Sequence, residues 1–228
     1  MEQKPVLLDS LPARSNPTIL KALSLQTRGI RRRMLLGSKP RVSLYTVVTT
    51  GLGRMKEVDT GKAYRLFYPS VPAVLSASHR KTVSAMPVVS FTALSESPSL
   101  VGVSSLPSHT THKTVIAARR FSLCWLDKKD IRAMAHLASH AGKEGEDKLL
   151  SAGLKHHRGK RVDVPVIDAA VAVLECSLTK TIRFGDHELL VGRVKASYAI
   201  EDFRDYWSFE VYRPILYTGW RGDLATLD

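Results

Sequence analysis

A polar stretch at residues 104–120, SSLPSHTTHKTVIAARR, concentrates groups that could bind an anion. Ser108, Thr110 and Thr111 carry hydroxyls there, and His109 can add positive charge. An apolar run precedes the stretch, and a helical pattern follows it. The free N–H groups and positive dipole end of a helix that begins here would point back at the turn, which is the arrangement of a phosphate site. The alternative is an ordinary Ser/Thr helix cap with nothing bound.

Other chemistries at these residues have weaker support. His109 and His112 lie three apart with no third ligand nearby, which disfavours a metal site. Cys124 and Cys176 each lie in an apolar run without a CxxC partner, so we expect buried free thiols rather than a zinc site or a disulfide. The sequence contains no GxSxG, HExxH, Walker or GxGxxG motif.

Two further segments could contact a ligand. In residues 81–99 the small side chains of Ser84, Ala85 and Ser90 would let backbone amides approach a flat molecule closely; the alternative is a strand with a polar outer face. His187 begins a strand directly after a tight turn, where a histidine is either a surface residue or a functional one.

Short β-segments with few helices must position these residues. Phe184-Gly185-Asp186 is a hairpin signal between two long strands within residues 169–199. The pattern predicts an α+β, mainly β fold built on an antiparallel barrel. We expect strands in 71–78, 85–95, 100–105, 121–126 and 213–219, helices in 111–120, near 131–138 and in 147–152, and an exposed basic loop at 156–161.

The net charge of +13 is unevenly distributed, because residues 1–54 carry +8 of it. This segment is either a disordered basic arm, an Arg-rich targeting peptide, or sequence upstream of a natural start at Met55. A basic arm would permit nucleic-acid binding, but the interspersed charges of residues 55–228 disfavour a nucleic-acid groove there. No run approaches the roughly 18 apolar residues that a membrane-spanning helix requires.

Motifs taken in order resemble the flavin reductase-like, FMN-binding split-barrel family, from about residue 64 to residue 227. That family includes flavoredoxins and NAD(P)H:flavin oxidoreductases. The matching segments, in chain order, are SAMP (84–87), SESPS (95–99), LVGV (100–103), PSHTTH (107–112), EGEDKLLSAGL (144–154), LECSL (174–178), GDHELLVGRV (185–194) and RPILYTG (213–219). The resemblance implies a Greek-key split β-barrel that forms a homodimer, with FMN, or alternatively FAD, near the dimer interface.

The resemblance also implies a set of flavin contacts. These are Ser84, Ala85, Met86 and Pro87 at the ring, Ser90, Phe91 and Thr92 along the ring and ribityl chain, Ser108, His109, Thr111 and His112 at the phosphate, and His187 near the nicotinamide. Three residues depart from the family pattern. Ser84 replaces an Asn, His109 replaces an Arg, and Pro87 offers no N–H to the ring.

The function implied is NAD(P)H-dependent flavin reduction, in which hydride passes from nicotinamide to flavin and the cofactor carries the chemistry. The reduced flavin would serve a partner oxygenase or another electron acceptor. The alternative is a flavoredoxin-like electron carrier that holds FMN, is reduced by another redox protein and does not use NAD(P)H. A third hypothesis is nucleic-acid binding through residues 1–54, which predicts steep salt dependence. We expect a cytoplasmic protein without membrane or metal partners.

Overall fold

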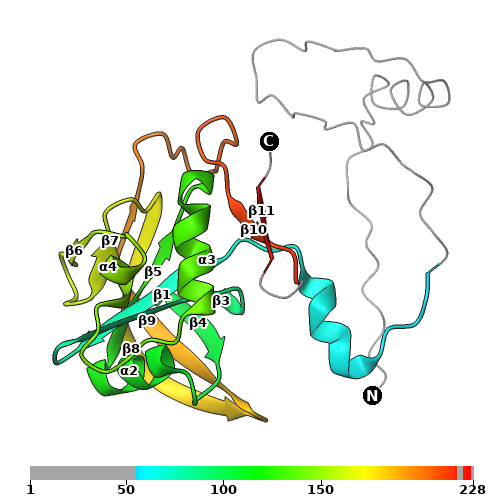
Figure 1. Cartoon of the computed structure of the whole chain (residues 1–228), viewed down its shortest axis with the longest axis horizontal. Coiled ribbons are helices and arrows are strands. Elements are labelled where there is room, and N and C mark those ends of the chain that lie inside the picture. Colours follow the sequence, from blue (N-terminus) through cyan, green and yellow to red (C-terminus); the bar gives the residue numbers. More distant parts are fainter. Residues whose placement is uncertain (1–54, 220–222, 227–228) are drawn as a thin grey trace, which may run out of the picture. The chain divides into compact units, whose positions relative to one another are not determined.

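The computed structural model describes residues 55–219 and 223–226 (Figure 1). The segment 1–54, on which the prediction of a basic extension falls, lies outside the described residues. Lys56–Asp228 cluster as one compact unit. No described helix is both long enough and apolar enough to cross a membrane.

Seven antiparallel strands form the main sheet, in the order β2–β1–β5–β8–β9–β4–β3. Their bounds are Ala73–His79 (β1), Thr82–Val88 (β2), Phe91–Ser95 (β3), Leu100–Ser105 (β4), Arg120–Trp125 (β5), Ala172–Phe184 (β8) and His187–Ala199 (β9). The predicted long hairpin is confirmed as β8 and β9, which turn at Gly185 and Asp186. Gly185 has a φ of 56°, a conformation that glycine adopts at no steric cost.

Short elements complete the chain. The helices are η1 (Thr60–Phe67), α2 (Thr110–Ala118), η2 (Lys128–Asp130), α3 (Ile131–Ser139) and α4 (Lys148–Ser151). Two small hairpins pair β6 (His156–Arg158) with β7 (Pro165–Ile167), and β10 (Ile215–Tyr217) with β11 (Leu224–Thr226). The prediction of a basic loop at 156–161 was therefore wrong over its first half.

The part of the main sheet around β1 and β5 is buried on both faces, and successive residues of these strands enter different hydrophobic clusters. Val74 and Cys124 pack into a cluster that includes Met134 of α3, whereas their neighbours Leu75 and Leu123 pack into a second cluster. This alternation follows from the two-residue period of a strand. It also explains why five successive residues of β1, from Ala73 to Ala77, are all buried rather than alternately exposed.

The two edge strands of the sheet, β2 and β3, are consecutive in the chain. The expected single strand at 85–95 is instead these two strands, separated only by Val89 and Ser90. With about 3.8 Å between consecutive Cα atoms, Val88 and Phe91 can be at most about 11 Å apart, so the sheet curls to bring its edges near each other. The ladders of the described strands include none between β2 and β3, so the sheet is open here and barrel closure stays a prediction.

Helices α2, α3 and α4 all contact the edge strand β2. Backbone bonds add to this contact, since Val83 donates its N–H to the carbonyl of Glu146 at 2.9 Å and forms a parallel bridge with Asp147. The outer edge of β2 therefore packs against helices, and its residues lie beside the starts of α2 and α4.

Both cysteines are buried and free, as predicted. Burial raises the pKa of Cys124 to about 11 and that of Cys176 to about 12. Because the thiolate is the reactive form, neither thiol is a nucleophile near neutral pH.

A buried carboxylate on β8 organises the loop after β6. Glu175 is fully buried and accepts the backbone N–H groups of Lys160, Arg161 and Val162 at 2.7–2.8 Å. Burial raises the pKa of Glu175, but the three N–H donors lower it more strongly, so the pKa lies below its ordinary value.

Replacing Glu175 with Gln should lower the free energy of unfolding by about 2–3 kcal/mol, because one oxygen is lost and an NH2 group faces N–H donors. The contribution of the wild-type carboxylate is present above the ordinary pKa of about 4.3 and is lost as the pH falls through the lower folded pKa. Urea unfolding between pH 3 and 7 measures both effects, with the exposed Glu144→Gln as the matched control. Equal stability of the wild type and Glu175→Gln at pH 7 would contradict this assignment.

Candidate functional site

A cavity of about 620 Å³ runs beside β2. Three parts of the chain build it: the strand β2, the helices that contact β2, and segments close to both ends of the described chain. The lining residues are Tyr68, Pro72, Met86, Pro87, Val89, Ser108, His109, Thr110, Thr111, Leu137, Ala138, Ser139, His140, Ala141, Gly142, Lys148, Tyr217 and Leu224. The set contains no acidic side chain among the described residues.

One end of the cavity is formed by the start of α2. Strand β4 ends at Ser105, and the chain turns through residues 106–108 into the helix. The Ser/Thr cap that the sequence left as an alternative is not formed, because the N-cap residue is His109, and its side chain makes no capping hydrogen bond. The first N–H groups of α2 therefore lie beside the cavity without a side-chain acceptor, as an anion site requires.

A buried hydrogen bond holds this helix start against β2. The hydroxyls of Ser84 and Thr111 lie 2.9 Å apart, and both side chains are almost inaccessible to solvent. Thr110 adds a contact to the loop before α4, since its hydroxyl lies 3.4 Å from the carbonyl oxygen of Gly142. These bonds fix the polar end of the cavity between β2, α2 and the 140–147 segment.

Lys148 supplies a buried cation to the same region. Its side chain is 4% exposed, and Nζ donates to the carbonyl oxygen of Leu137 at 2.9 Å. Burial lowers its pKa, which the carboxylate of Glu146 partly offsets. Segment 144–154 belongs to the family-like pattern, yet nothing local marks Lys148 as a cavity residue, because its burial depends on the distant helix α3.

The surroundings of His109 lower its pKa. Partial burial lowers its pKa, and the nearby side chains of His112, His187 and Lys148 lower it further. A bound anion would relieve this repulsion.

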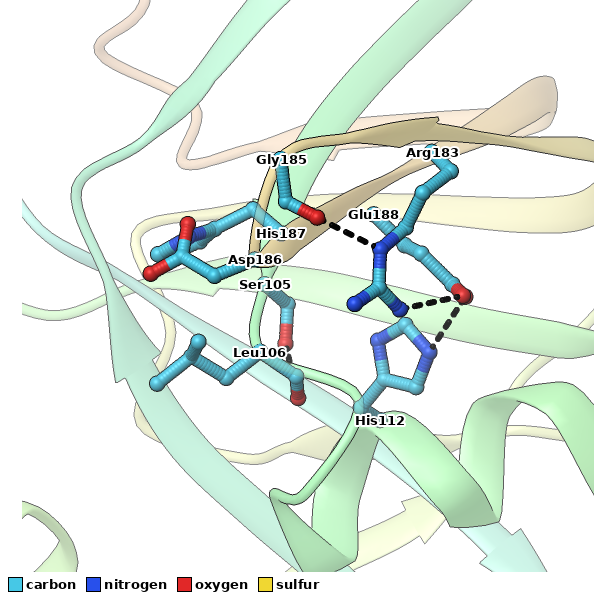
Figure 2. A network of polar contacts seen from close by, with 8 residues as sticks. All are labelled: Ser105, Leu106, His112, Arg183, Gly185, Asp186, His187 and Glu188. Carbon is cyan, nitrogen blue, oxygen red and sulfur yellow. Dashed lines mark hydrogen bonds and ion pairs between the residues drawn. The ribbon is translucent and has the colours of Figure 1, made fainter.

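The remaining predicted phosphate residue, His112, faces away from the cavity lining. It is buried, and its Nε2 lies 3.1 Å from the Glu188 carboxylate, which also contacts Arg183 at 3.4 Å (Figure 2). Its Nδ1 is buried without a hydrogen-bond partner among the described residues. His187, on the same hairpin, is partly exposed and bonds through Nδ1 to Asp186 at 2.7 Å.

Five other predicted residues also lie outside the lining, among them Ser84, which is bonded to Thr111. Ala85 is buried in the core, while Ser90 and Thr92 are exposed at the start of the opposite edge strand. Phe91 packs edge-to-face against Trp125, with ring centroids 5.6 Å apart. The structure thus groups Met86, Pro87, Ser108, His109 and Thr111 around one cavity, with Ser84 bonded to Thr111, and leaves the β3 residues apart.

Comparison with known proteins adds a family relationship. A family profile described as "Flavin reductase like domain" matches residues 64–218. A solved structure titled as an FMN-binding protein from Thermus thermophilus with bound 1-cyclohex-2-enone is 31% identical, with a TM-score of 0.61, and the match covers 86% of this chain and 96% of that chain.

Two curated relatives were also found. An uncharacterized protein from Aeropyrum pernix is 31% identical over 166 residues, which are 72% of this chain and 63% of that protein. A Streptomyces globisporus protein named NADH-dependent FAD reductase is 30% identical over 105 residues, or 46% of this chain and 57% of that protein. The chain therefore spans less than two thirds of the length of either relative.

Replacing Lys148 with Met should leave the melting temperature unchanged or raise it, because a buried ammonium is removed while the side-chain volume is kept. Thermal unfolding followed by circular dichroism measures this, with the exposed Lys143→Met as control. A fall of several degrees for Lys148→Met alone would show that Lys148 stabilises the fold through its bond to Leu137 and that its burial needs no ligand in the cavity.

Proposed function

This chain belongs to the flavin reductase like family, and on that premise we propose that it binds FMN and is an NAD(P)H-dependent flavin reductase. The observation that carries the proposal is the single cavity that joins Met86 and Pro87 of β2 to the start of α2. Residues 84–87 and 107–112 are distant in sequence, and the family resemblance assigns them to the flavin ring and to the phosphate, respectively.

The residues present fit a flavin mononucleotide. The cavity changes from polar, at Thr111 with its buried hydrogen-bond partner Ser84, to apolar, at Pro87 of β2 and the adjoining Val89. Five residues of strand span about 16 Å, so the two ends are separated by a length suited to an elongated ligand. A planar apolar ring joined to a phosphate matches this polarity.

Several polar groups near the start of α2 then have a role. Ser108 and Thr111 would donate hydroxyl hydrogen bonds to the phosphate, the first N–H groups of α2 would add theirs, and the charge of Lys148 would stabilise the dianion. Met86 and Pro87 would present an apolar surface to the ring. The bound flavin would supply hydride chemistry, which explains why the chain has no familiar catalytic motif.

The reductant and the assembly belong to the same proposal. The family resemblance assigns His187 to the nicotinamide, and His187 lies close enough to His109 to lower the pKa of that residue. The nicotinamide site would therefore lie beside the cavity. NADH use by the Streptomyces relative favours a nicotinamide reductant, and its name makes FAD the alternative flavin. We propose a cytoplasmic homodimer in which the exposed Ser90 and Thr92, with Phe91, complete the flavin site near the interface; His112 would support the phosphate site from behind.

Anaerobic reduction tests the proposed function. Protein supplied with FMN should perturb the flavin absorbance bands, and NADH or NADPH should bleach them within seconds to minutes. Bleaching by dithionite but by neither nucleotide would overturn the reductase and favour the flavoredoxin-like carrier. Unperturbed bands would overturn flavin binding altogether.

Replacing both His109 and Thr111 with Ala should weaken FMN binding about tenfold or more, because charge-assisted and hydroxyl bonds to the phosphate are lost. Riboflavin, which has the same ring without the phosphate, should bind both proteins equally. Fluorescence titration gives the dissociation constants, and an equal loss for the two ligands would contradict the phosphate assignment.

The single change His109→Ala should show a pH-dependent effect. The pKa of His109 lies below its ordinary value, so the imidazole becomes a cation only as the pH falls through that lowered value. The ratio of FMN dissociation constants, variant over wild type, should therefore rise as the pH falls from 8 to 5. Protonation of the phosphate of free FMN affects both dissociation constants equally, so it cancels in their ratio. A ratio that does not change with pH would mean that His109 carries no charge at the phosphate.

Replacing His187 with Ala should slow flavin reduction by NADH about tenfold while changing FMN affinity less than twofold. Stopped-flow absorbance separates the two quantities, and His79→Ala serves as the control, because His79 is exposed and lies outside the cavity lining. An equal loss of both quantities would place His187 at the flavin rather than at the nicotinamide.

A further inference from the structure

Segments from both ends of the described chain build one part of the cavity wall. This part lies toward the C-terminal end of β2, because Ala73, which follows the lining residue Pro72, pairs with Val88, whereas α2 begins beside Ser84. Tyr68 follows η1 at the start of the domain, and Tyr217 ends β10 close to the C-terminus. Both line the cavity, and their rings form an edge-to-face pair with centroids 4.7 Å apart and an interplanar angle of 79°. Neither tyrosine belongs to the residues assigned above.

Backbone hydrogen bonds hold the two segments that carry the tyrosine pair together. Ser70 and Tyr217 exchange two backbone hydrogen bonds, at 3.2 and 2.9 Å, which join the two chain segments as an antiparallel bridge. Arg65 of η1 reinforces the bridge by donating Nη1 to the carbonyl oxygen of Gly219 at 2.7 Å. These bonds join the two segments into one wall of the cavity, the tyrosine wall, which Tyr68 and Tyr217 line.

Gly219 is the third part of this wall. Its φ is 84°, and a Cβ atom at this position would lie 2.4 Å from Cδ2 of Tyr68. A side chain here would overlap the Tyr68 ring, and the backbone conformation also disfavours one. The absence of a side chain at Gly219 leaves the space that the Tyr68 ring occupies.

We propose that Tyr68 and Tyr217 contact the planar ring of the bound flavin, and that Gly219 is a positioning residue for Tyr68. This inference rests on the proposed function. Aromatic side chains bind flat heteroaromatic rings by stacking and edge contacts, and the phosphate-like polarity lies at the other end of the cavity. The ring therefore extends along Pro87 and Val89 toward the tyrosine pair.

The test compares FMN with lumiflavin, which is the ring without the ribityl phosphate. Tyr68→Leu, Tyr217→Leu and Gly219→Ala should each weaken both ligands by about threefold to tenfold. Tyr68→Phe, which keeps the ring, should retain the wild-type dissociation constants within twofold. Phe67→Leu is the matched control, because Phe67 is the adjacent aromatic, is 80% exposed and lies outside the cavity lining.

The outcomes separate this inference from the proposed function. If the wild type binds FMN but the leucine variants bind lumiflavin normally, the contact between the tyrosines and the flavin ring is overturned, whereas the proposed flavin site is not. A raised KM for NADH with unchanged lumiflavin binding would assign the wall to the nicotinamide ring and overturn the flavin contact. If the wild type binds neither ligand, both claims fall. Tyr68→Leu and Tyr217→Leu decide the matter even if Gly219→Ala does not fold.

Discussion

The two-residue link between β2 and β3 is the constraint on which the site depends. These strands occupy opposite edges of a seven-stranded sheet, yet only Val89 and Ser90 separate them. The sheet must curl around the cluster that contains Leu75 and Leu123, and β2 is left with one edge unpaired by another strand of the sheet. Helices α2, α3 and α4 pack against β2, and the cavity forms between that strand and those helices.

The polarity of the cavity changes along β2, because a different element packs against each part of that strand. Beside Ser84 lie a helix start and the buried ammonium of Lys148, with no carboxylate in the lining to neutralise them. Such an arrangement opposes folding, because burial disfavours the charged form of lysine and the neighbouring cations disfavour protonation of His109. A bound dianion would reverse both effects. Residues that are unfavourable for the free fold but favourable for a ligand are typical of functional sites.

Sequence patterns predicted the parts of the site that depend on local structure. The turn and helix start around Ser108 and the small residues near Ser84 are short-range signals, and the family-like order of motifs added their roles. Lys148 and the tyrosine pair were missed because long-range packing brings them to the cavity. Thr111 and His112 show a further limit. Adjacent helical residues point about 100° apart, so one lines the cavity and the other contacts Glu188.

A crystal structure of the protein grown with FMN tests the central claim most directly. The account predicts the phosphate within hydrogen-bonding distance of Thr111 and the first N–H groups of α2, with the ring along Met86 and Pro87. FMN bound in the reverse direction, or at another surface while this cavity holds only solvent, would contradict it.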